Sequence, residues 1–269
     1  MQIGVSLSRT EGKRAEVNGA RLRAAEQLRG ESATLVFTPD RLAIVKAGPA
    51  ARRAYLDRSL ARLFPSRSRL PTDYSAALAQ RNAALKRGDR GAVSPWTEQV
   101  ARLGAALVEA RLETLELLGG PFAEQAGLLG LESARLGYEG DPPTAEALEA
   151  RLDRDLERGA TGLGPHLDDV SIAAGARDLR AFGSQGEQRT AVLALLLAEA
   201  ELIEERRGEA PLLLLDDVLS ELDPTRRRVL ADQLSGRGQT LITSTTADAL
   251  PGEPAQLLQV SPGEVQWSA

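Results

Sequence analysis

The sequence contains no cysteine and only one histidine, His166. Without cysteine the chain can form no disulfide, no thiolate metal site and no cysteine nucleophile. A single histidine also excludes a metal site made from several imidazoles of one chain. Aromatic residues make up only 3% of the sequence against 42% hydrophobic residues, so leucine, alanine and valine must build the core. Such a core favours helices over an aromatic-rich β-sandwich.

Excess positive charge and long apolar runs are absent as well. The net charge is −5, so nucleic-acid binding would need a local basic patch rather than a global positive field. Arginine far outnumbers lysine, which a compositional bias explains as well as phosphate contacts do. No apolar run approaches the roughly 18–20 residues of a membrane span, and the N-terminus has no signal-peptide pattern. These features predict a soluble cytoplasmic protein, and 269 residues suffice for one large domain or two modest ones.

The N-terminal part of the chain alternates like a β-hairpin. Residues 2–9 and 13–19 predict two strands joined by a turn, so the chain looks as if it is entered midway through a sheet. A short helix is expected over 20–30, and a strand closed by Pro39 is expected over 33–40.

The middle of the chain has a helical pattern. Helices are expected over 49–63, 74–87, 96–118 and 145–158. The third of these has Ser94 as its expected N-cap and Pro95 at its first position. Because little strand signal occurs between about 60 and 160, this region is predicted to be a helical insert.

A different pattern follows the helical region. Residues 168–182 are typical of a hairpin that turns at Gly175, and residues 238–245 of a short buried strand. A long apolar helix and a leucine strand lie between them. Strand–helix–strand alternation at this spacing predicts a parallel sheet with crossover helices.

Two aspartates directly follow a run of leucines in PLLLLDD, residues 211–217. Four continuous leucines are too few for a helix and apolar on both faces, which indicates a central strand of a parallel sheet. Ligands bind at the carboxyl ends of such strands. There Asp216 can hold a hydrated Mg²⁺ while Asp217 orients a water. The alternative is that the two aspartates only cap the next element.

The stretch GSQGEQR, residues 183–189, precedes the apolar helix. Ser184 is the expected N-cap, Gly186 allows another backbone to approach closely, and the first N–H groups of the helix are free to bind an anion. Residues 191–198 are apolar all round, so the helix should be buried and its N-terminus firmly aimed. Taken alone this motif is only a capped helix, but its spacing from the paired aspartates favours a functional interpretation.

These motifs resemble those of ATP-binding-cassette ATPases. Residues 184–188 (Ser184, Gln185, Gly186, Glu187 and Gln188) resemble the signature motif, residues 212–217 the Walker B strand, and residues 220–223 (Ser220, Glu221, Leu222 and Asp223) the D-loop. Within that superfamily the motif sequences are most similar to those of the RecF family of bacterial recombination mediators, which is related to SMC heads. Further stretches carry this likeness in the order that RecF proteins have them: VFTPDRLAIVKAGPAARRAYLD (36–57), LAQRNAALK (78–86), GPHLDDV (164–170) and RAFGSQGEQRTAVLALLLAEAEL (180–202).

The resemblance implies an α/β ATPase head of the ATP-binding-cassette type, similar to P-loop NTPases, with a helical second lobe. Residues 1–60 and 160–269 would then form the ATPase lobe, and residues 61–159 the helical lobe II. By the same resemblance, Mg²⁺ and ATP join two heads into a homodimer, and the signature of one head faces the phosphates held by the other. Ser184 and Gly186 would contact the γ-phosphate in trans, Asp216 would hold the metal, and Asp217 would act on the hydrolytic water.

The function implied by the resemblance is recombinational repair and replication of DNA. A RecF-like head is expected to clamp single-stranded and gapped duplex DNA, to work with RecO and RecR, and to support RecA loading at single-strand gaps. The family hydrolyses ATP slowly and in a DNA-dependent manner. Two alternatives remain open, namely another SMC-like or ATP-binding-cassette head, and a non-enzymatic interaction module that kept its dimer surface and lost nucleotide binding.

The phosphate-binding loop of such ATPases does not occur in this sequence. The motif GxxxxGK[ST] cradles phosphates with its lysine and backbone N–H groups. Its nearest counterpart, Gly12-Lys13-Arg14, has Leu7 in place of the first glycine and Arg14 in place of the hydroxyl residue. RecF proteins carry the loop in an N-terminal segment, so the first strands and the loop are expected to be missing here. The chain alone is therefore expected to be inactive as an ATPase.

Other positions depart from the common pattern or leave two interpretations open. The switch region has Thr243, Ser244 and Thr245 where most cassette ATPases have a histidine, and Asp217 stands where most have glutamate. His166 could face nucleotide or a partner lobe, although a structural role in its loop is the simpler interpretation. The arginines of one helix could contact DNA or could form a solvated face; they are Arg52, Arg53 and Arg58.

Overall fold

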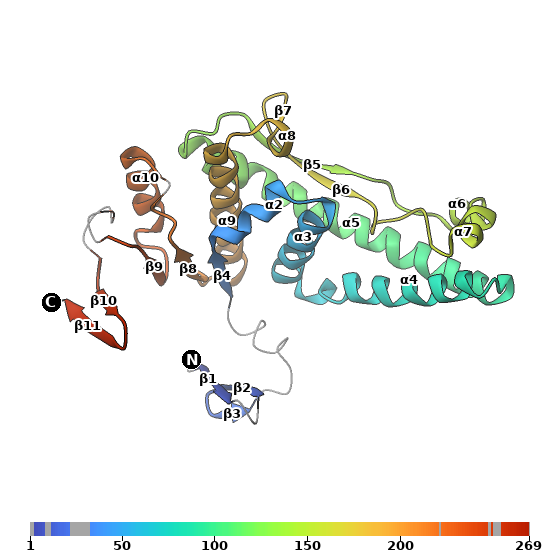
Figure 1. The fold of residues 1–269 in the computed structure, drawn as a ribbon, viewed down its shortest axis with the longest axis horizontal. Coiled ribbons are helices and arrows are strands. Elements are labelled where there is room, and N and C mark those ends of the chain that lie inside the picture. Colours follow the sequence, from blue (N-terminus) through green and yellow to red (C-terminus); the bar gives the residue numbers. More distant parts are fainter. Residues whose placement is uncertain are drawn as a thin grey trace.

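The computed structural model describes residues 3–8, 12–21, 33–220, 222–246, 249 and 254–268. An α/β body carries a long helical arm that extends to one side (Figure 1). The body contains strands β4 (Thr34–Phe37), β8 (Leu212–Asp216) and β9 (Thr240–Thr243), with η1 (Pro39–Leu42), α2 (Ala43–Lys46), α8 (Leu179–Phe182), α9 (Gln185–Arg207) and α10 (Pro224–Leu234). The arm contains α3 (Pro49–Leu63), η2 (Pro65–Arg67), α4 (Leu70–Lys86), α5 (Arg90–Leu128), α6 (Ala145–Glu149) and α7 (Leu152–Arg158), and strands β5 (Ala134–Glu139), β6 (Asp169–Ala174) and β7 (Arg177–Asp178) run along it.

The leucine strand β8 is the central strand of a parallel sheet, as the sequence predicted. The sheet has the order β4-β8-β9, and both neighbours of β8 run parallel to it. Leu213 and Leu215 point to one face, where α9 covers them and residues 191–198 are buried on all sides. On the other face, Val36, Leu214 and Leu241 are in register across the three strands, and Leu241 is half exposed. One face of the sheet is therefore the core of the body, and the other is partly open.

Helix α5 is longer than the sequence predicted. It begins after Asp89, whose side chain accepts the Ala92 N–H, and the expected cap Ser94 and first position Pro95 lie inside it. At the other end, the expected stop at the Gly119–Pro121 stretch is also wrong. Four side chains beyond or beside that stretch are fully buried against the body; they are Leu118, Phe122, Ala126 and Leu129.

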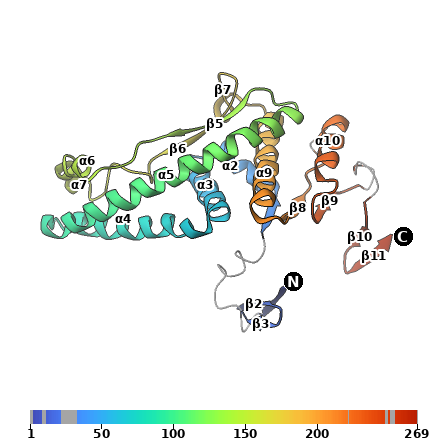
Figure 2. The same cartoon turned by 180° about the vertical axis from the view of Figure 1, so that it is seen from behind.

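Helix propensity and burial compete at this point of α5. Relative to alanine, each glycine in a helix costs about 1 kcal/mol, and a proline costs about 3 kcal/mol. Full burial of each large apolar side chain contributes about 1.5–3 kcal/mol. Burial of the turn that carries Phe122 against α9 therefore offsets the local preference for stopping, and Figure 2 shows α5 continuing until it reaches α9.

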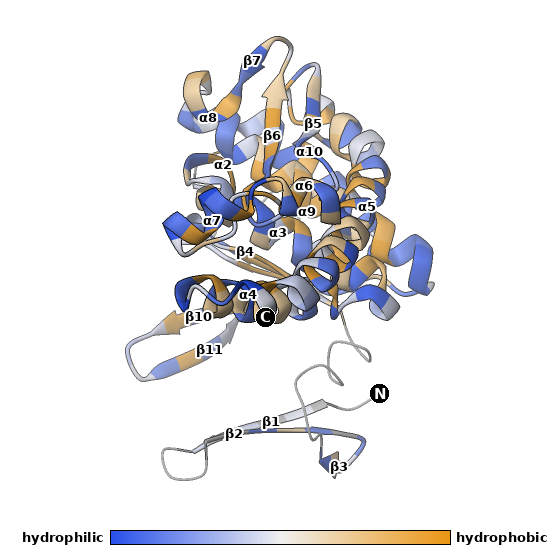
Figure 3. Cartoon of the chain, turned by 90° about the vertical axis from the view of Figure 1, so that its right-hand side faces the viewer, coloured by the Kyte–Doolittle hydropathy of each residue, from blue (hydrophilic) through white to orange (hydrophobic). Residues whose placement is uncertain are grey.

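The helical region also contains a strand that the sequence analysis missed. Strand β5 pairs antiparallel with β6, and β6 turns at Gly175 into β7, as predicted for that hairpin. The helix expected over 145–158 is divided into α6 and α7. The β5 stretch gives a weak signal because it mixes charged, small and aromatic residues. Much of β6 is coloured as apolar in Figure 3, and its Val170 packs with Leu56 of α3 and Leu115 of α5.

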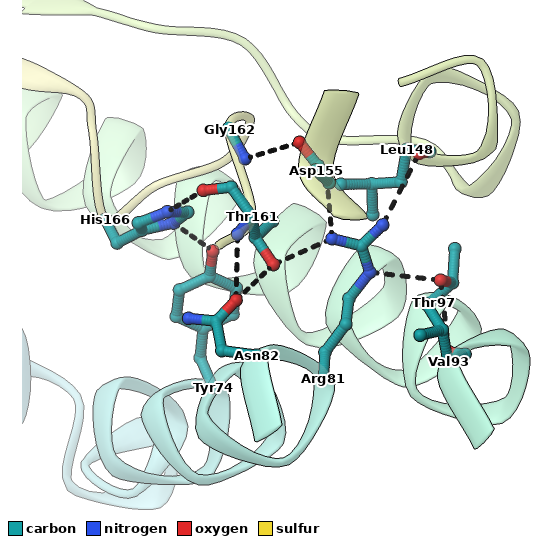
Figure 4. Close-up of polar contacts among 10 residues, drawn as sticks. All are labelled: Tyr74, Arg81, Asn82, Val93, Thr97, Leu148, Asp155, Thr161, Gly162 and His166. Carbon is teal, nitrogen blue, oxygen red and sulfur yellow. Dashed lines mark hydrogen bonds and ion pairs between the residues drawn. The ribbon is translucent and has the colours of Figure 1, made fainter. Parts of the chain in front are cut away.

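A buried polar network holds the far part of the arm together (Figure 4). The Arg81 guanidinium, fully buried, donates to the Asp155 carboxylate at 2.9 Å and to the Thr161 hydroxyl at 2.7 Å. His166 Nε2 bonds the carbonyl oxygen of Thr161 at 3.1 Å, so Nε2 carries the proton and Nδ1 accepts the Tyr74 hydroxyl at 2.7 Å. The network also includes Asn82, Thr97, Leu148 and Gly162. These bonds give His166 a structural role in its loop.

The loop 164–169 that contains His166 is also held by two arginines of α3. Arg52 of α3 donates two hydrogen bonds to the Asp169 carboxylate, at 2.7 and 2.8 Å. Arg53 donates to the Asp168 carbonyl oxygen at 2.6 Å. Because β6 begins at Asp169, this loop connects the arm directly to the strand that leads back toward α9.

Two hairpins at the ends of the chain lie outside the main body (Figures 1 and 2). The first contains β1 (Ile3–Ser8), β2 (Gly12–Val17) and β3 (Ala20–Arg21), which confirms the two predicted strands. Of the helix expected over 20–30, the first two residues are strand, and the rest lies outside the described residues. The second hairpin contains β10 (Leu257–Ser261) and β11 (Glu264–Ser268). Within the described part of the chain, no helix is long and apolar enough to cross a membrane.

Candidate nucleotide site

The N-terminus of α9 is closed by a capping box, as the sequence predicted for Ser184. The Glu187 N–H donates to Ser184 Oγ at 3.2 Å, and the Ser184 N–H donates to the Glu187 carboxylate at 2.8 Å. An ion pair with Arg177 and the hydrogen bond from Ser184 lower the pKa of Glu187 to about 2. Glu187 therefore stays ionised near neutral pH, and both Ser184 and Arg177 hold it in the capping box.

The predicted signature residues divide into two groups. Ser184, Gln185 and Gly186 are exposed, and the N–H groups of Gln185 and Gly186 precede the first intrahelical bond. Glu187 completes the cap, and Gln188 is buried, where its side chain donates to the Leu179 carbonyl oxygen at 2.8 Å. The first three residues can therefore meet an anion, while the last two fix the direction of the helix.

The carboxyl end of β8 brings the paired aspartates and one switch residue together. Asp216 is exposed, and its Oδ1 accepts the Thr243 hydroxyl at 2.6 Å. The same Thr243 oxygen accepts the Asp217 N–H at 3.1 Å. Asp217 has a φ of 49°, in the left-handed region that non-glycine residues rarely adopt. Thr243 thus contacts both aspartates, a role that the sequence analysis did not assign to it.

The Asp217 side chain turns toward the interior. Its Oδ1 is buried and has no hydrogen-bond partner among the described residues. It faces a hollow of about 40 Å³ that lies between the start of α9, η1 and the D-loop. The side chains around this hollow are Phe37, Pro39, Leu42, Arg189, Leu193, Val218, Ser220 and Leu222. Since a water needs about 10–15 Å³, the hollow can hold water against the Asp217 carboxylate.

The D-loop residues mainly shape the turn after β8. The Ser220 hydroxyl donates to the Asp217 carbonyl oxygen at 3.0 Å, and Leu222 is buried in the core. Asp223 caps α10 by accepting the N–H groups of Thr225 and Arg226, and the Arg226 hydrogen bond lowers the pKa of Asp223. Glu221 lies outside the described residues.

The remaining switch residues do not reach the aspartates by any hydrogen bond within the described part of the chain. The Ser244 hydroxyl donates to the Thr246 carbonyl oxygen at 2.9 Å, and Thr245 is exposed. Thr243 is therefore the switch residue that the structure brings to the Walker B strand.

The three arginines considered for DNA contact are in different environments. Arg52 is only 4% exposed and is engaged by Asp169, so it cannot reach a ligand on the surface. Arg53 is half-buried and donates to the Asp168 carbonyl oxygen. Of the three, Arg58 alone is exposed, and it forms no hydrogen bond or ion pair with a described residue. We therefore do not retain Arg52 as a DNA contact.

The residues at the end of β8 fit Mg²⁺ in part. Among the described residues, no cluster of three or more histidine, aspartate or glutamate side chains could enclose a metal ion. Mg²⁺ in phosphate-transferring sites is commonly held by one or two carboxylates together with water and substrate phosphates. The exposed Asp216 carboxylate beside the Thr243 hydroxyl is suited to that role, with phosphate oxygens and water completing the shell.

Comparisons with known proteins agree with this arrangement of sheet, capped helix and arm. No family model matches the chain. The chain is 36% identical over 267 residues to the DNA replication and repair protein RecF of Desulfitobacterium hafniense strain DCB-2, covering 93% of this chain and 73% of that protein. It is 41% identical over 230 residues to RecF of Anaeromyxobacter sp. strain K, covering 79% and 62%.

Two solved structures are similar over nearly the whole chain. A structure of the recombination mediator protein RecF with ATP has a TM-score of 0.81 at 30% identity, over 96% of this chain and 73% of that chain. A second, described as RecF-ATPrS in the RecFOR pathway, has a TM-score of 0.82 at 28% identity. The fold is that of an ATPase head of the ATP-binding-cassette type. The chain belongs to the RecF family of DNA replication and repair proteins.

Proposed function

We propose that this chain acts as the head of an ATP-dependent DNA clamp in recombinational repair. In this proposal two heads are joined by Mg²⁺ and ATP, bind single-stranded or gapped duplex DNA, and cooperate with RecO and RecR to load RecA. The likeness to RecF structures with ATP supports nucleotide binding by this fold. The similarity to RecF proteins, over 93% of this chain and 73% of the Desulfitobacterium hafniense relative, supports action on DNA.

The start of α9 is the observation that carries this proposal. It presents an exposed serine, glutamine and glycine at a helix N-terminus that a capping box, an ion pair and a buried glutamine hold in place. A helix N-terminus held in a fixed direction is suited to bind an anion that belongs to a nucleotide on another chain. In the proposed dimer that anion is the γ-phosphate of a nucleotide bound to the other head. Asp216 then serves the metal of the nucleotide held by its own head, and Asp217 the water.

A second candidate function is favoured by one specific observation. The sequence has no GxxxxGK[ST] motif, so it has no lysine loop of its own for phosphates. A head that lacks the loop can still offer its signature to a partner that has one. The second candidate is therefore an interaction module that completes a partner's nucleotide site without hydrolysing ATP itself.

The proposal is tested by pairing this chain with a head that carries the loop. We would mix the chain with the Desulfitobacterium hafniense relative, add MgATP, and measure complex size by light scattering. A mixed dimer should form with nucleotide, and Ser184→Arg should abolish it. The substitution removes the helix cap, which costs about 1 kcal/mol, and places a bulky side chain where a phosphate must approach.

Ser94→Arg is the matched control, because Ser94 is exposed on α5 and has no role in the site. Titration of the chain alone with MgATP should show no micromolar affinity, since the lysine loop is absent. A mixed dimer that survives Ser184→Arg would contradict the trans role of the signature. A dimer that forms equally without nucleotide would favour the interaction module.

A further inference from the structure

Three arginines, of which Arg58 is exposed and Arg41 and Arg62 are partly buried, come together where α3 meets α9 and η1. Arg58 and Arg62 lie four residues apart on α3 and therefore share one face of the helix. Arg62 forms an ion pair with Glu199 of α9 at 2.7 Å. Arg41 of η1 and Glu199 line the same small hollow, so Arg41 joins this group from the other side. We call Arg41, Arg58 and Arg62 the arginine triad.

The arginine triad has an excess of positive charge. Glu199 is buried and is already engaged by Arg62. The Arg41 and Arg58 guanidinium groups have no hydrogen bond or ion pair to any residue that the structure describes. Burial lowers the pKa of Arg41, and the nearby charges of Arg62 and Arg58 lower it further. The chain as a whole has a net charge of −5, so this local excess is contrary to the overall balance.

Like charges that converge beside a single carboxylate destabilise the folded chain unless an anion neutralises them. Guanidinium groups are planar and donate in pairs, a geometry that matches phosphate oxygens. We propose that the arginine triad is a phosphodiester-binding site that contacts the backbone of nucleic acid. This inference rests on the proposed function, and it names the surface through which an acidic chain would hold DNA.

The surroundings of the triad favour a chain of phosphates over an acidic protein. Arg206 lies seven residues beyond Glu199 on α9, which is about 10 Å along the helix axis. Its guanidinium lies 4.7 Å from the ring centre of Phe64, and that of Arg67 lies 5.3 Å from it. Arg67 is paired with Glu113, whereas Arg206 is exposed and donates to the Leu63 carbonyl oxygen at 3.2 Å, next to Arg62. Arg206 thus adds a positive group beside the triad, and guanidinium groups spread over such a distance suit successive phosphates of one strand.

The experiment compares two double variants of the full chain that lose the same charge. Arg41→Gln with Arg58→Gln removes the two free members of the triad and leaves Arg62 to neutralise Glu199. Arg154→Gln with Arg158→Gln removes two exposed arginines from α7 at the far end of the arm (Figure 1). Binding of a labelled gapped duplex is measured by fluorescence anisotropy at several salt concentrations. A parallel titration with inorganic phosphate, followed by thermal unfolding, tests binding of the free anion.

The triad variant should bind DNA more weakly than the natural chain, by a similar factor for unrelated DNA sequences. For the triad variant, the slope of log binding constant against log salt concentration should be smaller by about 0.9 for each duplex phosphate that the removed guanidinium groups neutralise. The α7 variant should keep the slope of the natural chain. Equal slopes for the two variants would overturn the inference while leaving the proposed function intact. Stabilisation by phosphate that the triad variant loses, together with unchanged DNA binding, would show a free-anion site and would also overturn it. Absence of DNA binding by the natural chain would instead contradict the proposed function.

Discussion

The α/β body and the helical arm both contain buried apolar clusters, but the arm also contains a fully buried ion pair. In the body, α9 and β8 bury mainly leucine, alanine and valine around one continuous core. In the arm, the Arg81 and Asp155 side chains are 0% and 1% exposed, and Arg81 donates three further hydrogen bonds to hydroxyl and carbonyl groups. Apolar cores tolerate substitutions of similar shape, whereas a buried ion pair fails when either partner is removed. The arm should therefore be the region that depends more on individual residues.

The largest effect is expected when the ion pair of the arm is broken. Asp155→Ala leaves the Arg81 charge buried without a carboxylate and also removes the acceptor of the Gly162 N–H. The free energy of unfolding should fall by about 3–5 kcal/mol, measured by urea denaturation.

Two controls sharpen this prediction. Asp153→Ala breaks the exposed pair with Arg90 and should cost less than about 1 kcal/mol. The double variant Arg81→Met with Asp155→Leu removes both charges and should recover much of the stability, because apolar replacements of buried pairs are often neutral. If Asp155→Ala cost no more than Asp153→Ala, the contrast between arm and body would disappear.

A large but more uniform effect is expected in the core of the body. Leu195→Ala on α9 deletes a side chain that is 1% exposed and should lower the free energy of unfolding by about 3 kcal/mol. Leu195→Met should cost less than about 1.5 kcal/mol, because it conserves volume. The matched control is Leu128→Ala on α5, where the side chain is 46% exposed and little change is expected. A large destabilisation by Leu195→Met would show that the body is as residue-specific as the arm.

A smaller effect on the free energy of unfolding is expected at Thr243, which ends strand β9. Thr243→Val removes the hydroxyl that contacts both Asp216 and the Asp217 N–H and should cost about 1 kcal/mol. Thr243→Ser keeps the hydroxyl and should restore stability. Carbon chemical shifts of Asp217 report its left-handed backbone, which should change in the valine variant and persist in the serine variant. An unchanged Asp217 signal in Thr243→Val would remove Thr243 from its positioning role.

The smallest effect is expected from a change of pH. It tests the contribution of the buried His166 to the stability of the arm. Burial lowers the pKa of His166, whereas an unfolded histidine has a pKa of about 6.5. The unfolded chain therefore binds the proton more readily, and the stability that neutral His166 provides is lost as pH falls below about 6.5. Urea midpoints at pH 7.5 and 5.5 measure this change. The fall should be smaller in His166→Gln, and an equal fall in both chains would contradict the assignment.

The sequence predicted most of the body because its signals are local. Four consecutive leucines indicate a buried parallel strand, and the apolar stretch after Ser184 indicates a buried, capped helix. The structure confirms both, together with the parallel pairing of β8 and the cap geometry of Ser184. Asp216 and Asp217 were predicted as candidate site residues for the same local reason, because ligands bind at the carboxyl end of such a strand.

The helices of the arm were largely predicted, but the polar contacts that join them and the Thr243 contact were not, because these contacts depend on residues far apart in the chain. Arg81 and Asp155 meet only after three helices have folded, and nothing near either residue indicates its partner. The Gly-Gly-Pro stretch of α5 gave the wrong helix end because burial of Phe122 overrides local propensity. Thr243 was placed in a switch region only by resemblance. Its hydroxyl finds Asp216 through the pairing of β9 with β8, which a single sequence does not specify.

The anchored loop at the base of β6 has a mechanical consequence. Asp169 is held by Arg52 of α3, and His166 is held by Tyr74 of α4. Strand β6 leaves this loop and, through β7 and α8, leads directly to Ser184. This loop therefore ties the far part of the arm to the one strand that leads toward the N-terminus of α9. We expect a displacement of the arm to reach Ser184 along this strand rather than through the apolar core.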